Sequence, residues 1–414
     1  MCITLEDRKC SEKMSDIRKF MKDRNNIADE RDDEKSLEKK LKRHKRGKIS
    51  KVLFLLVVLV AAAVAYTIYN CNRVYTEYEV ISSVGINDTY NSRFYGFGEY
   101  VLRYSEDGLA YLNGEKTYWN QAFEMREPII DVCDGYVAIA DKRTNVVYIC
   151  NTESLQGKIE TEYPIVGLDV SAGGIVAAIT EEDSDVSHIE MIGKDGTKIA
   201  KGQTVLSGEG CPVDLSVSKD GSKLVVSYLY VGSGIIQSKV VFYNYSEVGK
   251  NEVDRFVGAF DYNKTMMAKV EFLGNDLVAA FGDDKIVLYS IKQKPSVIAE
   301  IGVDNEIKSI FYCEDNFGFI VSNGEAEKPY TMIVYDTKGK KVSEIKFNLL
   351  YKDIKISDGN IVIYNDVTMV VYTVDGKEKY RGDFQEGITS VVMLDNDYNY
   401  IVITPSEIKT IKLK

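Results

Sequence analysis

A repeated unit of about 43 residues constrains the fold of this chain more than any other feature. An apolar strand ending in Tyr or Ile, a turn of three or four residues and a polar strand with Lys recur along the chain. The recurring landmarks are Tyr111, Tyr148, Ile192, Tyr243, Tyr289, Tyr335, Tyr372 and Ile411, at intervals of 37, 44, 51, 46, 46, 37 and 39 residues. A period of this length is typical of the four-stranded blade of a β-propeller.

A hairpin precedes most landmarks and links an inner strand to a very apolar one, as in DVCDGYVAIA and DVSAGGIVAAI. A strand apolar on both faces is expected between two neighbouring blades. The pattern therefore predicts an all-β propeller of eight blades, the first spanning Arg93 to Phe123. Seven blades remain an alternative because the 51-residue interval and the first unit are irregular. A β-solenoid or two sandwiches fit less well, since solenoid rungs are shorter and sandwiches lack a constant period.

The last unit, from Ile388 onward, contains only three strands. We expect the segment TEYEVISSV, residues 76–84, to supply the fourth. Pairing of this segment with the C-terminal strands would close the ring and remove exposed sheet edges.

Residues Val52 to Tyr69 form an uninterrupted apolar run, VLFLLVVLVAAAVAYTIY. As a helix of about 27 Å it would cross the roughly 30 Å hydrocarbon core of a bilayer. Residues 39–51 carry eight Lys or Arg, whereas residues 70–92 carry only Arg73. The positive-inside rule therefore predicts a cytoplasmic N-terminus and a cell-membrane protein with a single span. Ala63-Val64-Ala65 also fits a signal-peptidase site, so cleavage after Ala65 is the alternative.

The expected organisation is a charged, largely disordered cytoplasmic tail (1–51), a transmembrane helix (52–69) and an extracytoplasmic propeller (70–414). The tail holds 17 Lys and Arg against 11 Asp and Glu, and the remaining chain holds 35 against 52. The acidic remainder argues against a nucleic-acid partner outside the membrane. Five scattered cysteines, Cys71, Cys133, Cys150, Cys211 and Cys313, do not form the even, regularly spaced set of a disulfide framework.

The turns YDTKGK at Tyr335 and SVSKDGSKL at Ser216 resemble those of quinoprotein-like and WD40-like propeller repeats. The layout of tail, single membrane helix and C-terminal propeller is similar to that of uncharacterised clostridial-type bacterial membrane proteins. This resemblance implies a fold but no established activity. The chain has a single tryptophan, Trp119, and no adjacent cysteine pair. Quinone-dependent chemistry, which would use such features, is therefore not expected, and we predict no cofactor.

One set of polar residues occupies similar positions in successive inner strands: Asp131, Asp169, Asp214, Lys269, Lys308 and Asp353. If these strands converge on a central channel, the side chains would form a polar ring able to bind a charged or peptide ligand. Alternatively, they satisfy backbone groups between strands. The histidine that follows the acidic stretch 181–185, His188, is expected on the surface, because one histidine cannot form a typical zinc site. No catalytic or metal-binding motif is present.

We therefore expect a non-enzymatic scaffold that recognises an envelope protein or glycan and contacts the bilayer through residues 52–69. The alternative is a carbohydrate-acting hydrolase or lyase, which would need two carboxylates about 5 to 10 Å apart at the channel mouth.

Overall fold

The computed structural model describes residues 14–19, 21, 54–66, 69, 72–86, 91–113, 116–232, 234–394 and 398–414. The chain divides into two units, Met1–Arg73 and Val74–Lys414. In the first unit, residues 14–19 and 54–66 are helical. Most of the predicted tail lies outside the described residues, as do residues 52, 53, 67 and 68 of the predicted span. No helix in the described part of the chain has the length and apolar character that a membrane crossing requires.

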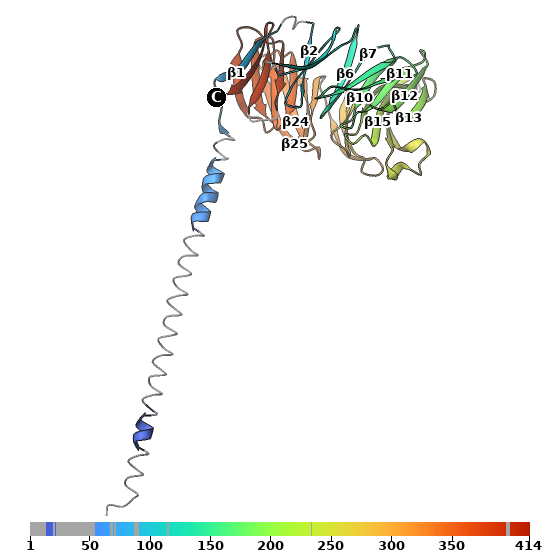
Figure 1. Cartoon of the computed structure of the whole chain (residues 1–414). Helices are drawn as coiled ribbons and strands as arrows, with labels where there is room; N and C mark the ends of the chain where they lie inside the picture. Colours follow the sequence, from blue (N-terminus) through green and yellow to red (C-terminus); the bar gives the residue numbers. More distant parts are fainter. Residues whose placement is uncertain are drawn as a thin grey trace, which may run out of the picture. The chain divides into compact units, whose positions relative to one another are not determined.

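The second unit consists of eight antiparallel sheets of four strands each. Figure 1 shows strands from successive sheets following one another through the domain in chain order. The all-β, eight-bladed prediction is confirmed, and the seven-bladed alternative is wrong. Each blade is numbered by its place in the ring, and its strands are given from the inner one outward.

The first four blades contain strands β2 to β17. Blade 1 comprises β2 (Arg93–Phe97), β3 (Tyr100–Ser105), β4 (Gly108–Leu112) and β5 (Thr117–Ala122). Blade 2 comprises β6 (Pro128–Cys133), β7 (Tyr136–Asp141), β8 (Val146–Asn151) and β9 (Leu155–Glu160). Blade 3 comprises β10 (Ile165–Val170), β11 (Ile175–Glu181), β12 (Val186–Gly193) and β13 (Lys198–Val205). Blade 4 comprises β14 (Cys211–Val217), β15 (Lys223–Gly232), β16 (Ile235–Asn244) and β17 (Phe256–Tyr262), with 3-10 helices η1 (Glu247–Gly249) and η2 (Val253–Arg255) before β17.

The remaining blades complete the ring. Blade 5 comprises β18 (Met267–Phe272), β19 (Leu277–Gly282), β20 (Lys285–Ser290) and β21 (Ser296–Gly302). Blade 6 comprises β22 (Ile307–Tyr312), β23 (Asn316–Ser322), β24 (Tyr330–Asp336) and β25 (Lys341–Phe347). Blade 7 comprises β26 (Asp353–Ser357), β27 (Asn360–Tyr364), β28 (Thr368–Thr373) and β29 (Glu378–Asp383). Blade 8 comprises β30 (Ser390–Met393), β31 (Asn399–Ile403), β32 (Glu407–Leu413) and β1 (Tyr78–Gly85).

Strand β1 closes the ring, as the sequence predicts. It pairs antiparallel with β32 from Tyr78↔Leu413 to Gly85↔Glu407, with one irregularity between Val80 and Ser82. In Figure 1, β1 lies beside the red strands of the C-terminus. Strands β2 and β30, the inner strands of blades 1 and 8, contact each other. The first and last blades are therefore joined both at the centre and through the closing strand.

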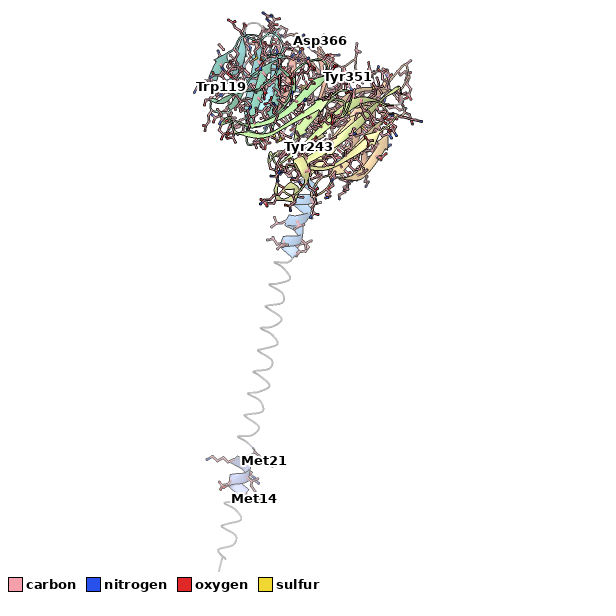
Figure 2. All side chains as sticks on the ribbon, turned by 90° about the vertical axis from the view of Figure 1, so that its right-hand side faces the viewer. Met14, Met21, Trp119, Tyr243, Tyr351 and Asp366 are labelled. Carbon is pink, nitrogen blue, oxygen red and sulfur yellow. The ribbon has the colours of Figure 1, made fainter. Side chains whose placement is uncertain are left out.

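The core lies between neighbouring blades. One cluster joins blade 4 to blade 5, where Phe242 and Tyr289 are fully buried and meet edge-to-face with ring centroids 5.0 Å apart. Such a pair adds roughly 0.5–1.5 kcal/mol to the effect of area burial. Blades 1 and 2 are also linked by Trp119 Nε1, which donates to the Thr152 carbonyl at 3.2 Å (Figure 2). The apolar second strands predicted from the sequence are therefore covered on both faces.

The hairpin β15–β16 is longer than its neighbours. Each strand has ten residues, whereas β14 pairs with β15 only as far as Leu229 and β17 pairs with β16 only as far as Ser238. Beyond these points the two strands pair only with each other, up to Gly232↔Ile235. The end of this hairpin, residues 230–232 and 234–237, therefore extends past the sheet of blade 4.

Candidate functional site

Two cavities lie where the inner strands face one another. A cavity of about 530 Å³ is bordered by residues of blades 1, 2, 6, 7 and 8, including Tyr95, Phe311 and Lys355. A second, of about 230 Å³, is bordered by blades 2 to 6, including Asp169 and Glu271. Both are bordered by Tyr312, so they adjoin. Together they form the central channel, with a largely apolar half and an acidic half.

Three aspartates of the predicted ring bond to the backbone of the next blade. The contacts are Asp131 Oδ2 to Val170 N (2.9 Å), Asp169 Oδ2 to Val217 N (2.6 Å) and Asp214 Oδ2 to Val270 N (2.7 Å). In each contact a carboxylate on one inner strand accepts an N–H of the following inner strand. These bonds connect blades 2 to 5 in series. The three aspartates therefore satisfy backbone groups, which was the alternative to ligand binding in the sequence analysis.

Lys269 lies among carboxylates. Its Nζ is 3.3 Å from Asp214 Oδ2 and 3.0 Å from Glu271 Oε2. Burial opposes its charge, but Glu271 and then Asp214 raise the pKa of Lys269 well above its usual value. Glu271 was not among the residues selected from the sequence. The period of two along a strand offers a signal for it, because Glu271 follows Lys269 by two residues on β18 and shares its face.

The buried acids of this cluster hold their protons more strongly than usual. Burial, followed by the charges of Asp131 and Glu271, raises the pKa of Asp169 well above its usual value. Burial also raises the pKa of Glu271, although Lys269 opposes this shift. Tyr312 donates to Glu271, and burial and that carboxylate raise the pKa of Tyr312. The acidic half of the channel is therefore a desolvated, proton-retaining cluster.

The other two members of the predicted ring lie apart from this cluster. Lys308 is ion-paired with the exposed Glu306. Asp353 accepts from the Tyr364 hydroxyl at 3.1 Å, and its neighbour Lys355 donates to the Val391 carbonyl at 2.8 Å. The structure thus brings together Asp131, Asp169, Asp214 and Lys269 but not Lys308 or Asp353. Lys308 lies at an irregularity of the β22–β23 ladder, between Ile307 and Ser309, and Asp353 is the first residue of β26, so equal spacing in the sequence does not bring these side chains to the cluster.

A lysine bridges the rim of the acidic half. Lys219, in the turn between β14 and β15, lies 3.0 Å from Asp134 Oδ2 in blade 2 and also pairs with Glu314 in blade 6. The side-chain bonds to Glu314 and Asp134 raise the pKa of Lys219. The turn that carries it needs Gly221, whose φ is +73°. Turns from three separate blades are therefore linked across the channel.

His188 is buried, so the prediction of a surface histidine is wrong. It lies within strand β12 and is 3% exposed. Its Nε2 is 2.9 Å from Glu182 Oε2, and its ring stacks on Tyr163 with centroids 4.4 Å apart. A pattern with charged residues at 181–185 suggested a loop, but β11 continues to Glu181 and β12 begins at Val186, which leaves only a tight turn.

A second surface lies at the end of the long hairpin. The side chains of Val231, Ile235 and Ile236 are 73%, 50% and 55% exposed. Nearby, Leu206 and Met266 are also exposed. Each part is held by a hydrogen bond at its own blade: Tyr230 Oη to Asp261 Oδ1 at 3.4 Å in blade 4, Leu206 N to the Asp185 carbonyl at 2.9 Å at blade 3, and Met266 N to Asp283 Oδ1 at 2.8 Å at blade 5. We call this region the hairpin surface.

Acidic residues lie in the turns of blades 3 and 5 that correspond to the end of the long hairpin, and beside the strands of blade 4. Exposed carboxylates lie in the β11–β12 turn of blade 3, before β14, at the end of β17 and in the β19–β20 turn of blade 5: Glu181, Glu182, Asp183, Asp185, Glu209, Asp261, Asp283 and Asp284. The nearby lysines Lys201 and Lys239 pair with Glu162 and Asp261. The apolar end of the hairpin is therefore bordered on two sides by negative charge.

Within the described residues, no three His, Cys, Asp or Glu side chains are arranged to hold a metal ion. The four described cysteines of the propeller, Cys133, Cys150, Cys211 and Cys313, are free, and Cys150 is fully buried. Cys71 lies outside the described residues. Burial raises the pKa of Cys133 and Cys150 to about 12 each, so both are protonated, unreactive thiols at neutral pH.

The fold is similar to those of solved propellers. BamB from Moraxella catarrhalis matches with a TM-score of 0.50 and 11% identity, covering 81% of this chain and all of that one. Hsv2 from Kluyveromyces lactis matches with a TM-score of 0.46 and 14% identity, covering 73% of this chain and 98% of that one. At these identities the likeness concerns the fold alone. No curated protein sequence matches the chain. Residues 71–413 match the model of a family of unknown function, DUF5711, and the chain belongs to that family.

Proposed function

We propose that this protein is a non-enzymatic interaction scaffold held at the cell envelope by residues 52–69, with its propeller outside the membrane. The observation that carries the scaffold proposal is the hairpin surface. Val231, Ile235 and Ile236 lie at the end of a two-stranded extension and are at least half exposed. Apolar side chains gathered at one exposed place are typical of protein-binding sites.

The charges around the hairpin define the partner. Carboxylates of blades 3, 4 and 5 lie beside the apolar end, and they outnumber the lysines there, of which Lys201 and Lys239 are paired with Glu162 and Asp261. A partner segment with an apolar centre and Lys or Arg at its edges would bury Val231 and Ile236 and meet the acidic border with opposite charge. Nucleic acids and anionic lipid surfaces would be repelled at the same place.

The channel carboxylates support the scaffold over the hydrolase or lyase alternative. Asp131, Asp169 and Asp214 each accept a backbone N–H of the next blade. Carboxylates bonded in this way stabilise contacts between blades, and moving one to act on a substrate would break such a contact.

Site-directed photocrosslinking in intact cells tests the scaffold proposal. A photoreactive side chain at Ile236 is expected to label one protein through a segment rich in Lys or Arg. Val231→Ser and the pair Asp183→Asn, Asp185→Asn should each weaken this labelling. The matched control is a probe at Leu350, which is 73% exposed but lies between blades 6 and 7. Equal labelling from both probes, or labelling of lipid from Ile236, would contradict the proposal.

The membrane anchoring is supported by the apolar run Val52–Tyr69 and by the cations that precede it. Protease added to intact cells, after removal of any outer barrier, should digest the propeller and leave the first fifty residues protected. Digestion of the tail alone would show the opposite orientation. Release of the propeller into the medium without protease would show cleavage after Ala65.

A further inference from the structure

Three buried polar atoms on one face of blade 3 have no hydrogen-bond partner within the described residues: Thr180 Oγ1, His188 Nδ1 and Glu190 Oε2. Their side chains are 0%, 3% and 1% exposed. Buried polar groups of folded proteins are almost always bonded, to protein or to ordered water. Three unbonded atoms at one place therefore indicate a bound group.

The strand register places the three side chains together. Thr180 pairs directly with His188 in the β11–β12 ladder. Glu190 lies two residues beyond His188 on β12, so its side chain points to the same face. Val176 and Ile192, on this same face, pack against Ala138 and other residues of blade 2. The three atoms thus lie in the interface between blades 2 and 3.

The segment 161–164, which connects the two blades, covers this place. Glu162 N donates to Glu190 Oε1 at 3.1 Å, and the Tyr163 ring stacks on His188. Lys201 pairs with Glu162 and lies over the Tyr163 ring at 5.4 Å. Glu190 Oε1 and His188 Nε2 are therefore hydrogen-bonded within the protein. Glu190 Oε2 and His188 Nδ1 each need a further hydrogen-bond partner.

The known partners define the chemistry of the missing one. His188 Nε2 faces the Glu182 carboxylate at 2.9 Å, and a carboxylate only accepts, so Nε2 is the donor; in this tautomer Nδ1 is an acceptor. Glu190 Oε2 is also an acceptor, whereas the Thr180 hydroxyl can donate. Two acceptors and one donor match the two O–H donors and the lone pair of water.

We infer that one water molecule is bound between blades 2 and 3, donating to His188 Nδ1 and Glu190 Oε2 and accepting from the Thr180 hydroxyl. The three atoms do not bond one another directly, and a single water can join groups too far apart for a direct bond. Neither a metal ion nor an ammonium ion has a lone pair, so neither could accept a hydrogen bond from the Thr180 hydroxyl. The water joins β11 and β12 to the connecting segment through Glu190.

A crystal structure of the full-length chain that resolves ordered waters tests the inference directly. The expected result is one peak within hydrogen-bonding distance of all three atoms, without anomalous signal from a metal. A metal peak would overturn the inference. So would a direct bond between His188 Nδ1 and Glu190.

Variants give an independent readout in solution. Thr180→Val removes the donor with little change of volume, so the water should be lost and amide exchange of Glu162 should become roughly tenfold faster. The matched control is Thr204→Val, since Thr204 is also buried in blade 3 but donates to the Ser187 carbonyl on the other face. It should leave both the peak and the Glu162 exchange rate unchanged. Unchanged exchange and an unchanged peak in Thr180→Val would contradict the role assigned to that hydroxyl.

Discussion

The central channel and the hairpin surface use their side chains in opposite ways. In the channel, Lys269 pairs with both Asp214 and Glu271, and Asp214 also accepts a backbone N–H of the next blade. At the hairpin surface, Val231 and Ile236 are exposed and contribute little to the core. Charge alone therefore does not mark a binding site here. The residues available to a partner are those that the fold does not use for its own stability.

The sharpest test of this contrast is removal of the central cation. Lys269→Met leaves the partly buried carboxylates of Asp214 and Glu271 without their counter-charge, and we expect a loss of about 1–3 kcal/mol in the free energy of unfolding. Denaturant unfolding measures this loss. Lys308→Met is the matched control, because Lys308 forms only a partly exposed pair with Glu306. The Lys308→Met variant should lose less than about 1 kcal/mol in the free energy of unfolding. Equal effects would show that burial of the cluster has no energetic consequence.

A second test uses pH. The pKa of Asp169 is raised in the folded state above its ordinary value of 3.8, so the unfolded chain releases this proton at lower pH than the folded one. The contribution of Asp169 to the free energy of unfolding is therefore fully present below pH 3.8, and it is lost as the pH rises through the raised pKa of the folded state. Asp169→Asn keeps an acceptor for Val217 N but cannot ionise. Between the two pKa values, we expect the variant to gain about 1.4 kcal/mol over the natural chain for each step of one in pH. Unfolding measured from pH 4 upward checks the sign, and a constant difference would contradict it.

The bridge across the channel rim should have a smaller effect. Lys219→Met removes the ion pairs with Asp134 and Glu314, whose side chains are about half exposed. Exposed pairs contribute little, so we expect a loss below about 1 kcal/mol that shrinks further in high salt. Thermal unfolding at low and high salt measures both. A loss as large as that of Lys269→Met would show that the ion pairs of Lys219 contribute as much to stability as those of Lys269.

The smallest effect on stability is expected at the hairpin surface. Val231→Ser and Ile236→Ser should change the free energy of unfolding by less than about 0.5 kcal/mol, because these side chains are already in water. Val231→Ser should nevertheless weaken the crosslink that a photoreactive side chain at Ile236 forms with the partner protein. A large destabilisation would show instead that the hairpin packs within the fold and is not free for a partner.

The fold could be predicted from the sequence better than the site. Alternation, turn residues and a 43-residue period reflect local geometry, so eight blades and the closing strand could be inferred. The structure brings together four of the six residues of the predicted ring, whereas Lys308 lies at an irregularity of its strand pairing and Asp353 at the start of β26. Burial of His188 was missed because the neighbouring charges of 181–185 resemble a loop. The length of the hairpin was not predicted, although the two ten-residue strands β15 and β16 lie at the end of the longest interval between landmarks, the 51 residues before Tyr243.

The pairing of β1 with β32 has a mechanical consequence. Covalent linkers join each of the other blades to its successor, but blade 8 is held together by a ladder of hydrogen bonds between strands from opposite ends of the domain. Blade 8 is therefore the blade at which the ring is expected to open first. Blade 4 is the fourth of eight and lies on the opposite side of the ring from blade 8. A partner bound at the β15–β16 hairpin would therefore contact the blade farthest from this opening.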